Sequence, residues 1–336
     1  MQDVSSIFQI SYLTLAENFR LRKRAILISL FIAILFLAVC FFTCYFFTIS
    51  RQTAACNWND GWRAWKDGRT DAALSCWSKN PFMAAVAPRP AKFYYWRIRA
   101  LEKLGRFEEA GMLKKTLAGK FPLDFYTFLI FPDGGLSVLP REKKIRAEVL
   151  FHPCPWRYEV EAASKRTGIP EYMIWAVMKR ESKFKTNAVS QSGAIGLMQL
   201  MPATAEAEAL SLKIAAPNVY LPEHNILLGA NYLARQIKKF DGDIIRAVAA
   251  YNAGTASVVR WNTLSANDWA EWIEDIPYYE TREFVRSVFE NREVYRIICG
   301  DKSGKTIFKV AGETPAPIKN YALCIKATAA LRIGQQ

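Results

Sequence analysis

The stretch IPEYMIWAVMKRESKFKTNAVSQSGAIGLMQLMPAT, residues 169–204, decides the fold of the larger part of this chain. It opens with Pro170 and Glu171, and a proline at an early helical position followed by an acidic residue favours the start of a helix. Three apolar residues and one carboxylate then recur at helical spacing: Ile174, Val177, Met178 and Glu181. This pattern predicts a helix that carries Glu181 in line with an apolar stripe and ends near Ser182.

Glu181 is the first candidate for chemistry, because a carboxyl group at this place should be harder to ionise than one in water. Burial against the apolar stripe and the negative end of the helix dipole both disfavour its charged form, so its pKa should rise. A carboxyl group with a raised pKa can act as a general acid at neutral pH. The alternative is a solvated side chain just past the helix end, paired with Lys185.

A glycine-containing loop follows this helix. The segment from Ser190 to Gln199 contains Gly193 and Gly196, as a tight turn with close backbone approach requires. Pro202 then stands where another helix would begin. The sequence therefore predicts a helix, a tight loop and a second helix in succession.

Three short motifs, in this order, resemble the signature motifs of the lytic transglycosylases, the lysozyme-like enzymes that cleave peptidoglycan. They are Glu181-Ser182, Gly196-Leu197-Met198-Gln199 and Ala250-Tyr251-Asn252-Ala253-Gly254. The resemblance covers about residues 161–297 and implies an α-helical, lysozyme-like domain with a glycan cleft. The residue pattern itself predicts consecutive helices there, without a convincing alternating strand. The expected fold class is all-α.

The resemblance also implies roles for individual side chains. Glu181 resembles the single catalytic acid and base of the family. The residues implied to bind the sugar are Ser190, Met198, Gln199, Tyr251, Asn252 and Glu280. For Tyr251 the alternative is a buried aromatic residue whose hydroxyl is satisfied locally. The chain departs from the family pattern at Thr186, where proline is frequent, and at Phe284, where tyrosine is usual, and both bear on loop shape more than on chemistry.

The implied reaction needs one carboxylate, whereas most glycosidases use two. Glu181 would protonate the glycosidic oxygen, and the resulting carboxylate would take the proton of the sugar's own 6-hydroxyl, which closes on the anomeric carbon. The nucleophile belongs to the substrate and gains from proximity. The product is a 1,6-anhydromuramyl end, and no cofactor is required.

Two other functions remain open. Glu280 as a second carboxylate that activates water would give a peptidoglycan hydrolase similar to goose-type lysozyme, and anhydro ends in a digest would separate the two reactions. A non-catalytic envelope scaffold that binds glycan through a degenerate domain would keep its biological role after Glu181→Gln.

An uncharged, largely apolar run extends from Ala25 to Ser50. About 20 such residues span the hydrocarbon core of a bilayer. Four basic residues stand immediately before the run: Arg20, Arg22, Lys23 and Arg24. This asymmetry predicts a single-pass inner-membrane helix with a cytoplasmic amino terminus and a periplasmic domain beyond Arg51. The alternatives are a cleaved signal peptide, a buried core helix and a lipoprotein processing site at Thr53-Ala54-Ala55-Cys56.

Between Asn57 and Leu150 the pattern predicts helical hairpins. A glycine-arginine turn occurs at Gly68-Arg69 and again at Gly105-Arg106, near the roughly 34-residue period of tetratricopeptide helix pairs. The second unit also resembles the helical linker before the catalytic domain of larger soluble lytic transglycosylases. The expected domains are a cytoplasmic tail 1–24, a transmembrane helix 25–50, a helical-repeat linker 51–150, a catalytic domain 151–300 and a C-terminal extension 301–336.

Cysteines and charge restrict compartment and partners. Cys56 with Cys76 and Cys299 with Cys324 could close short loops in an oxidising envelope, leaving Cys154 unpaired, although the sequence leaves the connectivity open. No metal site is expected, because the chain has only two histidines and no cysteine pair has ligand spacing.

The formal net charge of +14 comes from dispersed basic residues, which disfavours a nucleic-acid partner. Anionic wall polymer and lipid headgroups would account for it. The expected partners are peptidoglycan glycan strands, membrane lipid through one helix, and envelope proteins through the helical repeats.

Overall fold

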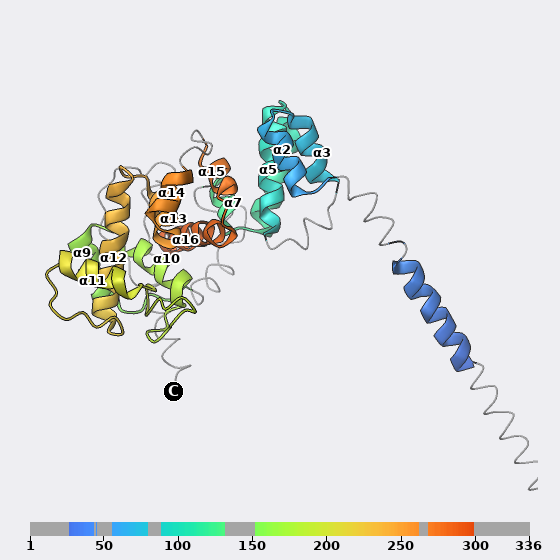
Figure 1. Ribbon diagram of the computed structural model, residues 1–336. Coiled ribbons are helices and arrows are strands. Elements are labelled where there is room, and N and C mark those ends of the chain that lie inside the picture. The colour runs from blue at the N-terminus through green and yellow to red at the C-terminus, as the bar shows by residue number, and fades with distance from the viewer. Residues whose placement is uncertain are drawn as a thin grey trace, which may run out of the picture. The chain divides into compact units, whose positions relative to one another are not determined.

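The computed structural model describes residues 27–43, 45, 56–79, 89–131, 152–261 and 268–298. Regular structure in these residues is helical, apart from two isolated β-bridges, Val189–Ile195 and Ile195–Leu200 (Figure 1). The chain divides into two compact units, Met1–Pro90 with Ala100–Gly105 and Ala91–Arg99 with Arg106–Gln336. The predicted all-α class is confirmed for the described residues.

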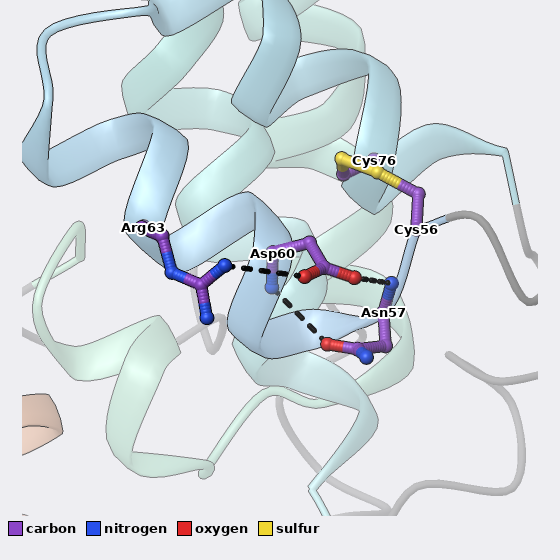
Figure 2. Close-up of a disulfide and its surroundings, with 5 residues drawn as sticks. All are labelled: Cys56, Asn57, Asp60, Arg63 and Cys76. Carbon is purple, nitrogen blue, oxygen red and sulfur yellow. Dashed lines mark hydrogen bonds and ion pairs between the residues drawn. A yellow bond between two sulfur atoms is a disulfide. The ribbon is translucent and has the colours of Figure 1, made fainter.

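In the first unit, α2 (Trp58–Lys66) and α3 (Thr70–Ser78) form a hairpin. Asn57 caps α2, because its Oδ1 accepts from the Asp60 N–H at 3.1 Å while its own N–H donates to Asp60 Oδ2 at 3.0 Å. A disulfide joins Cys56 to Cys76 in α3 (Figure 2). One of the two pairings suggested by the sequence is therefore present, while the other, Cys299 with Cys324, lies outside the described residues.

Tryptophans fill the inside of this hairpin. Trp77 is buried, and its ring lies 5.3 Å from that of Trp58 and 6.1 Å from that of Trp65. The Trp77 ring lies so near the α2 backbone that a Cβ on Gly61 would be 2.3 Å from its Nε1. The packing therefore requires glycine at position 61.

Both predicted glycine-arginine turns connect helices. Gly68 and Gly105 have φ angles of 77° and 74°, which glycine adopts without the steric penalty of a side chain. Gly68 separates α2 from α3, and Gly105 separates α5 (Pro90–Lys103) from α6 (Phe107–Lys120). The helix–turn–helix prediction is confirmed at both places.

The apolar segment near the amino terminus is described only in part. Residues 27–43 are helical, and their apolar side chains, such as Phe31 and Leu35, are exposed. Within the described ranges, none of the helices has both the length and the hydropathy that crossing a membrane requires. The remainder of the predicted transmembrane run, the tail 1–24 and the extension 301–336 lie outside those ranges.

The second unit holds the stretch that opened the sequence. After α7 (Phe125–Phe128), its helices in chain order are α9 (Arg157–Thr167), α10 (Glu171–Ser182), α11 (Pro202–Ser211), α12 (Pro222–Lys239), α13 (Ile244–Ala253), α14 (Thr255–Arg260), α15 (Trp269–Asp275) and α16 (Tyr279–Ile298). The predicted helix–loop–helix is α10, a loop and α11. Gly254, predicted as a helix stop, is the C-cap of α13.

The helix α10 lies at the centre of this unit and packs against α9 and α16. Its residues from Met173 to Met178 are all buried, so the apolar surface runs around the helix and is wider than the predicted stripe. Such a helix belongs in a protein core. Glu181 is therefore attached to one of the most buried elements of the unit.

Residues 91–99 and α7 contact α15 and α16 around a buried carboxylate. Glu274 of α15 is 4% exposed and forms ion pairs of 2.7 Å with Lys92 of α5 and with Arg286 of α16. It also accepts hydrogen bonds from the Tyr126 hydroxyl of α7 and from Trp96 Nε1, the latter at 3.4 Å. Residues 91–99 and α7 thus share a polar core with α15 and α16.

The chain before α9 is tied to the same core. The Tyr295 hydroxyl donates to the Pro153 carbonyl at 2.8 Å, and Trp175 Nε1 donates to the Pro155 carbonyl at 2.9 Å. Cys154 between them is buried. These two hydrogen bonds fix the segment that leads into α9.

Candidate active site

Glu181 sits in the last turn of α10, where the core gives way to the loop. Its side chain is half-buried. Burial raises the pKa of Glu181 to about 8, with Arg180 opposing the shift and the negative charge of Glu280 adding to it. The carboxyl group is therefore protonated at neutral pH, as the sequence predicted, and the effect of Glu280 means that the two acids lie within electrostatic reach of each other.

The backbone turns sharply immediately after Glu181. Lys183 and Phe184 have φ angles of 50° and 67°, a left-handed conformation that costs a residue with a side chain about 1–2 kcal/mol. Ser182 holds this turn, since its hydroxyl accepts from the Phe184 N–H at 3.1 Å and donates to the Leu197 carbonyl at 2.8 Å. The buried serine thus joins the end of α10 to the following loop.

That loop is built on its two glycines and its own polar side chains. Gly193 and Gly196 have φ angles of 86° and 81°. Ser190 Oγ accepts from the Ala194 N–H at 3.0 Å. Gln199 Nε2 donates to the Gly196 carbonyl at 2.9 Å and to the Ala188 carbonyl at 3.1 Å. Ser190 and Gln199, predicted to bind sugar, therefore make hydrogen bonds that shape the loop.

Met198 lies at the inner side of the loop with its side chain fully buried. Its thioether packs on α12 at Gly229, where a Cβ would be 2.5 Å from the sulfur. Its N–H donates to Asn225 Oδ1 at 2.7 Å. The backbone of Met198 is thereby fixed against α12.

Tyr251 of α13 reaches the same backbone from another side. Its hydroxyl donates to the Met198 carbonyl at 2.9 Å, and its ring lies 5.0 Å from Tyr232 and 6.3 Å from Phe284. Burial, together with the charge of Glu181, holds the pKa of Tyr251 well above its usual range. The phenol remains neutral, and its hydroxyl has the local partner that the sequence alternative foresaw.

The last two predicted residues lie on α13 and α16. Asn252 Oδ1 accepts from the Thr281 hydroxyl at 2.7 Å, which ties the end of α13 to the first turns of α16. Glu280, one residue before Thr281, is exposed. The structure thus gathers Glu181, the loop around Met198, Tyr251 and the start of α16 into one region of the second unit.

Two residues of this region were not foreseen. Asn225 bonds the loop backbone, and Tyr232 packs on Tyr251; both lie on α12, in line with Gly229 at helical spacing. The only signal in the sequence was a polar residue within the otherwise apolar face of a long helix. Over the ranges described, no group of three or more His, Cys, Asp or Glu side chains is placed to hold a metal ion.

Comparison with known families agrees with this geometry. Residues 159–271 match the family model described as Transglycosylase SLT domain. The match lies within the second unit and includes Glu181, the Met198 loop and Tyr251.

Two groups of proteins share this segment. The soluble lytic murein transglycosylase of Escherichia coli (strain K12) is 36% identical over 140 residues, which make up 40% of this chain and 22% of that protein. The membrane-bound lytic murein transglycosylase C of Edwardsiella ictaluri is 33% identical over 164 residues, or 41% of this chain and 46% of that protein. The matched segment thus covers less than half of either relative.

Solved structures extend the likeness beyond the SLT segment. An X-ray structure of lytic transglycosylase Slt from Pseudomonas aeruginosa, an inactive glutamate-to-glutamine mutant, superposes with a TM-score of 0.60 at 25% identity, covering 70% of this chain and 50% of that chain. The 70 kDa soluble lytic transglycosylase from Escherichia coli gives a TM-score of 0.56 at 20% identity, covering 76% and 53%. The predicted lysozyme-like helical fold is confirmed.

Proposed function

We propose that the second unit is a peptidoglycan lytic transglycosylase that cleaves the β-1,4 bond between MurNAc and GlcNAc and leaves 1,6-anhydroMurNAc ends. The observation that carries this proposal is Glu181, a carboxyl group kept protonated by burial at the end of α10 within an SLT domain. The relatives named lytic murein transglycosylases support it.

In this mechanism Glu181 works twice. Its carboxyl proton passes to the glycosidic oxygen as the bond to the anomeric carbon breaks, and the acetamido group of the muramic sugar supports the cationic centre. The carboxylate so formed accepts the proton of the C6 hydroxyl, whose oxygen bonds to the anomeric carbon. Glu181 ends protonated again, so one residue completes the cycle without water.

The neighbours of Glu181 fit supporting roles. The neutral Tyr251 hydroxyl and the buried surroundings give the acid a site of low polarity. There the electrostatic stabilisation of the charge that develops in the transition state is stronger than in water. Ser190, Met198, Gln199, Asn252 and Glu280 are proposed to contact the glycan. Ser190 and Gln199 would do so with bonding capacity beyond that used to shape the loop.

A hydrolase is the second candidate, and the position of Glu280 favours it. Glu280 is exposed on α16 and close enough to raise the pKa of Glu181. As a carboxylate it could activate water on the opposite face of the sugar, giving a reducing end.

Mass spectrometry of soluble fragments released from purified peptidoglycan tests the choice. A transglycosylase leaves MurNAc ends that are lighter by one water molecule than those of a hydrolase. Predominantly anhydro ends support the first proposal, whereas reducing ends from the start of the digest would replace it with the second.

The wider architecture is also proposed. The uncharged run 25–50, flanked by basic residues, would anchor the chain in the inner membrane with the domain 151–300 in the periplasm. The Cys56–Cys76 disulfide fits such an oxidising compartment. The helical linker 51–150 would offer a surface to envelope proteins. Detergent-dependent extraction of the full chain, with the domain exposed to protease in spheroplasts, tests the anchor.

A further inference from the structure

Asn225 uses its whole side-chain amide on the backbone around the Met198 loop. Its Oδ1 accepts from the Met198 N–H at 2.7 Å, while its Nδ2 donates to the Ile195 carbonyl at 3.0 Å and to the Val219 carbonyl at 2.8 Å. The residue is 1% exposed. A buried amide in this place is favourable only because each of these bonds is made.

The surroundings are shaped to let the loop approach this amide. A Cβ on Gly196 would lie 2.2 Å from Asn225 Nδ2, and Gly196 already has a φ of 81°. One turn further along α12, a Cβ on Gly229 would lie 2.5 Å from the sulfur of Met198. Two glycines thus bring the loop backbone within hydrogen-bonding distance of α12.

The segment that Asn225 holds joins three helices. The Leu197 carbonyl accepts from Ser182, next to Glu181 on α10, and the Met198 carbonyl accepts from the Tyr251 hydroxyl on α13. The Met198 N–H, between these carbonyls, points to Asn225 on α12. Displacement of this peptide would therefore disturb two hydrogen bonds at once: the one from Ser182, next to Glu181, and the one from the Tyr251 hydroxyl.

We propose that Asn225 is a positioning residue for the reaction: it fixes the Leu197–Met198 backbone and so holds Glu181 and Tyr251 in their productive relation. The kinetic part of this inference rests on the proposed function. The side-chain hydrogen bonds of Asn225 go to backbone groups of Met198, Ile195 and Val219, so it would act through the peptide that lies between the acid and the tyrosine.

The test uses the full chain with Asn225→Ala, and with Asn225→Ser as a milder variant that keeps a small polar group. Gln236→Ala is the matched control, because Gln236 is a buried amide on the same helix whose Oε1 accepts from Thr255 at 2.8 Å, away from the loop. Melting temperature, muropeptide release and hydrogen exchange of the peptide containing Met198 are measured for each.

We expect both Asn225 variants to exchange the Met198 amide faster and to lower kcat on soluble glycan strands roughly 10- to 100-fold, the scale of a small misplacement of catalytic groups. KM should change far less. Gln236→Ala should melt lower than wild type yet retain kcat. The proposal would be overturned if a folded Asn225→Ser protein kept the wild-type kcat. It would also be overturned if Gln236→Ala lowered kcat as much as the Asn225 variants do.

A double-mutant cycle with Tyr251→Phe separates positioning from general destabilisation. Both residues hold the same peptide, so the loss from Asn225→Ser should be several-fold smaller in the Tyr251→Phe background than in wild type. Losses that simply multiply would contradict the inference. A wild-type chain that releases no muropeptides would instead defeat the proposed function itself, which keeps the two failures distinguishable.

Discussion

At the scale of single residues, two carboxyl groups of the second unit show how the surroundings set the charge. Glu274 is buried and Glu181 is half-buried, and the partial burial of Glu181 raises its pKa to about 8. Burial also opposes ionisation of Glu274, but Arg286 and Lys92 outweigh it and lower its pKa to about 2. The acid without a strong cationic partner can donate a proton, whereas the paired acid remains a structural anion.

The first prediction concerns the pH dependence of the rate. Because Glu181 must carry its proton to begin the reaction, and its pKa is about 8, kcat for muropeptide release should fall as the pH rises through about 8. A profile measured on soluble glycan strands checks this. An ordinary exposed glutamate would lose activity near pH 4–5 instead, and that result would refute the assignment.

The second prediction is a stability effect with a definite sign. In the unfolded chain Glu181 ionises near its ordinary pKa, while the folded protein keeps it neutral up to about pH 8. The free energy of unfolding therefore falls as the pH rises from the unfolded pKa to the folded pKa. Above the folded pKa it falls no further on account of this group. One pKa unit is worth about 1.4 kcal/mol.

Glu181→Gln removes this penalty. Since the half-buried carboxyl group keeps part of its hydration, we expect the variant to gain about 1–3 kcal/mol over wild type between pH 5 and pH 9. Denaturant unfolding at the two pH values measures the difference. An equal difference at both would show that Glu181 titrates normally.

At this scale the sequence predicted only some of the residues of the candidate site. Glu181 and Tyr251 were predicted because each belongs to a short local motif, and Glu181 also follows the helical spacing of its own segment. Asn225 was missed, since its partners Ile195 and Met198 are distant in sequence and an asparagine in a helix has no pattern that marks such bonds. The left-handed Lys183 and Phe184 were missed because neither residue type favours that conformation.

At the scale of elements, α12 acts as the support of the site. Asn225, Gly229 and Tyr232 follow one another at helical spacing and contact the Met198 loop or Tyr251. The hydrophobic pattern of the sequence predicts this helix, but by helix propensity alone Gly229 should destabilise it. The structure shows that the missing side chain is what admits Met198.

Gly229→Ala is the third prediction. Alanine favours a helix over glycine by up to about 1 kcal/mol, but its Cβ would lie 2.6 Å from the Met198 Cβ. Overpacking of this kind costs about 1–3 kcal/mol, so we expect a net loss of about 1 kcal/mol and slower muropeptide release.

Gly111→Ala is the matched control for this change. Gly111 lies within α6, and a Cβ there would meet nothing within 4 Å. This variant should keep or slightly raise the melting temperature. If Gly229→Ala also raised the melting temperature and kept full activity, the support role of α12 would be wrong.

At the scale of the whole second unit, residues 91–99 and α7 share a buried polar core with α15 and α16. The sequence predicted helices on both sides but gave no sign that Lys92, Trp96 and Tyr126 meet Glu274, because these residues are far apart along the chain and belong to unrelated patterns. Within the described residues, 91–99, α6 and α7 belong to the same compact unit as α9 to α16.

Glu274→Gln provides the fourth prediction. It leaves Lys92 and Arg286 close to a neutral amide in a buried place, and breaking a buried ion pair costs about 3–5 kcal/mol. Calorimetry should show a melting temperature lower by several degrees. Glu109→Gln, which breaks an exposed pair with Arg106, should leave the melting temperature unchanged; similar losses in both variants would contradict this account.

The most direct test of the central claim is muropeptide release by Glu181→Gln in the full chain. Glutamine keeps the shape but has no carboxyl proton, and Glu206→Gln on the exposed face of α11 serves as control. With folding verified by the melting curve, we predict that Glu181→Gln releases anhydro-muropeptides roughly 100- to 10,000-fold more slowly than wild type, while Glu206→Gln matches it. Undiminished release by a folded Glu181→Gln protein would contradict the proposed mechanism.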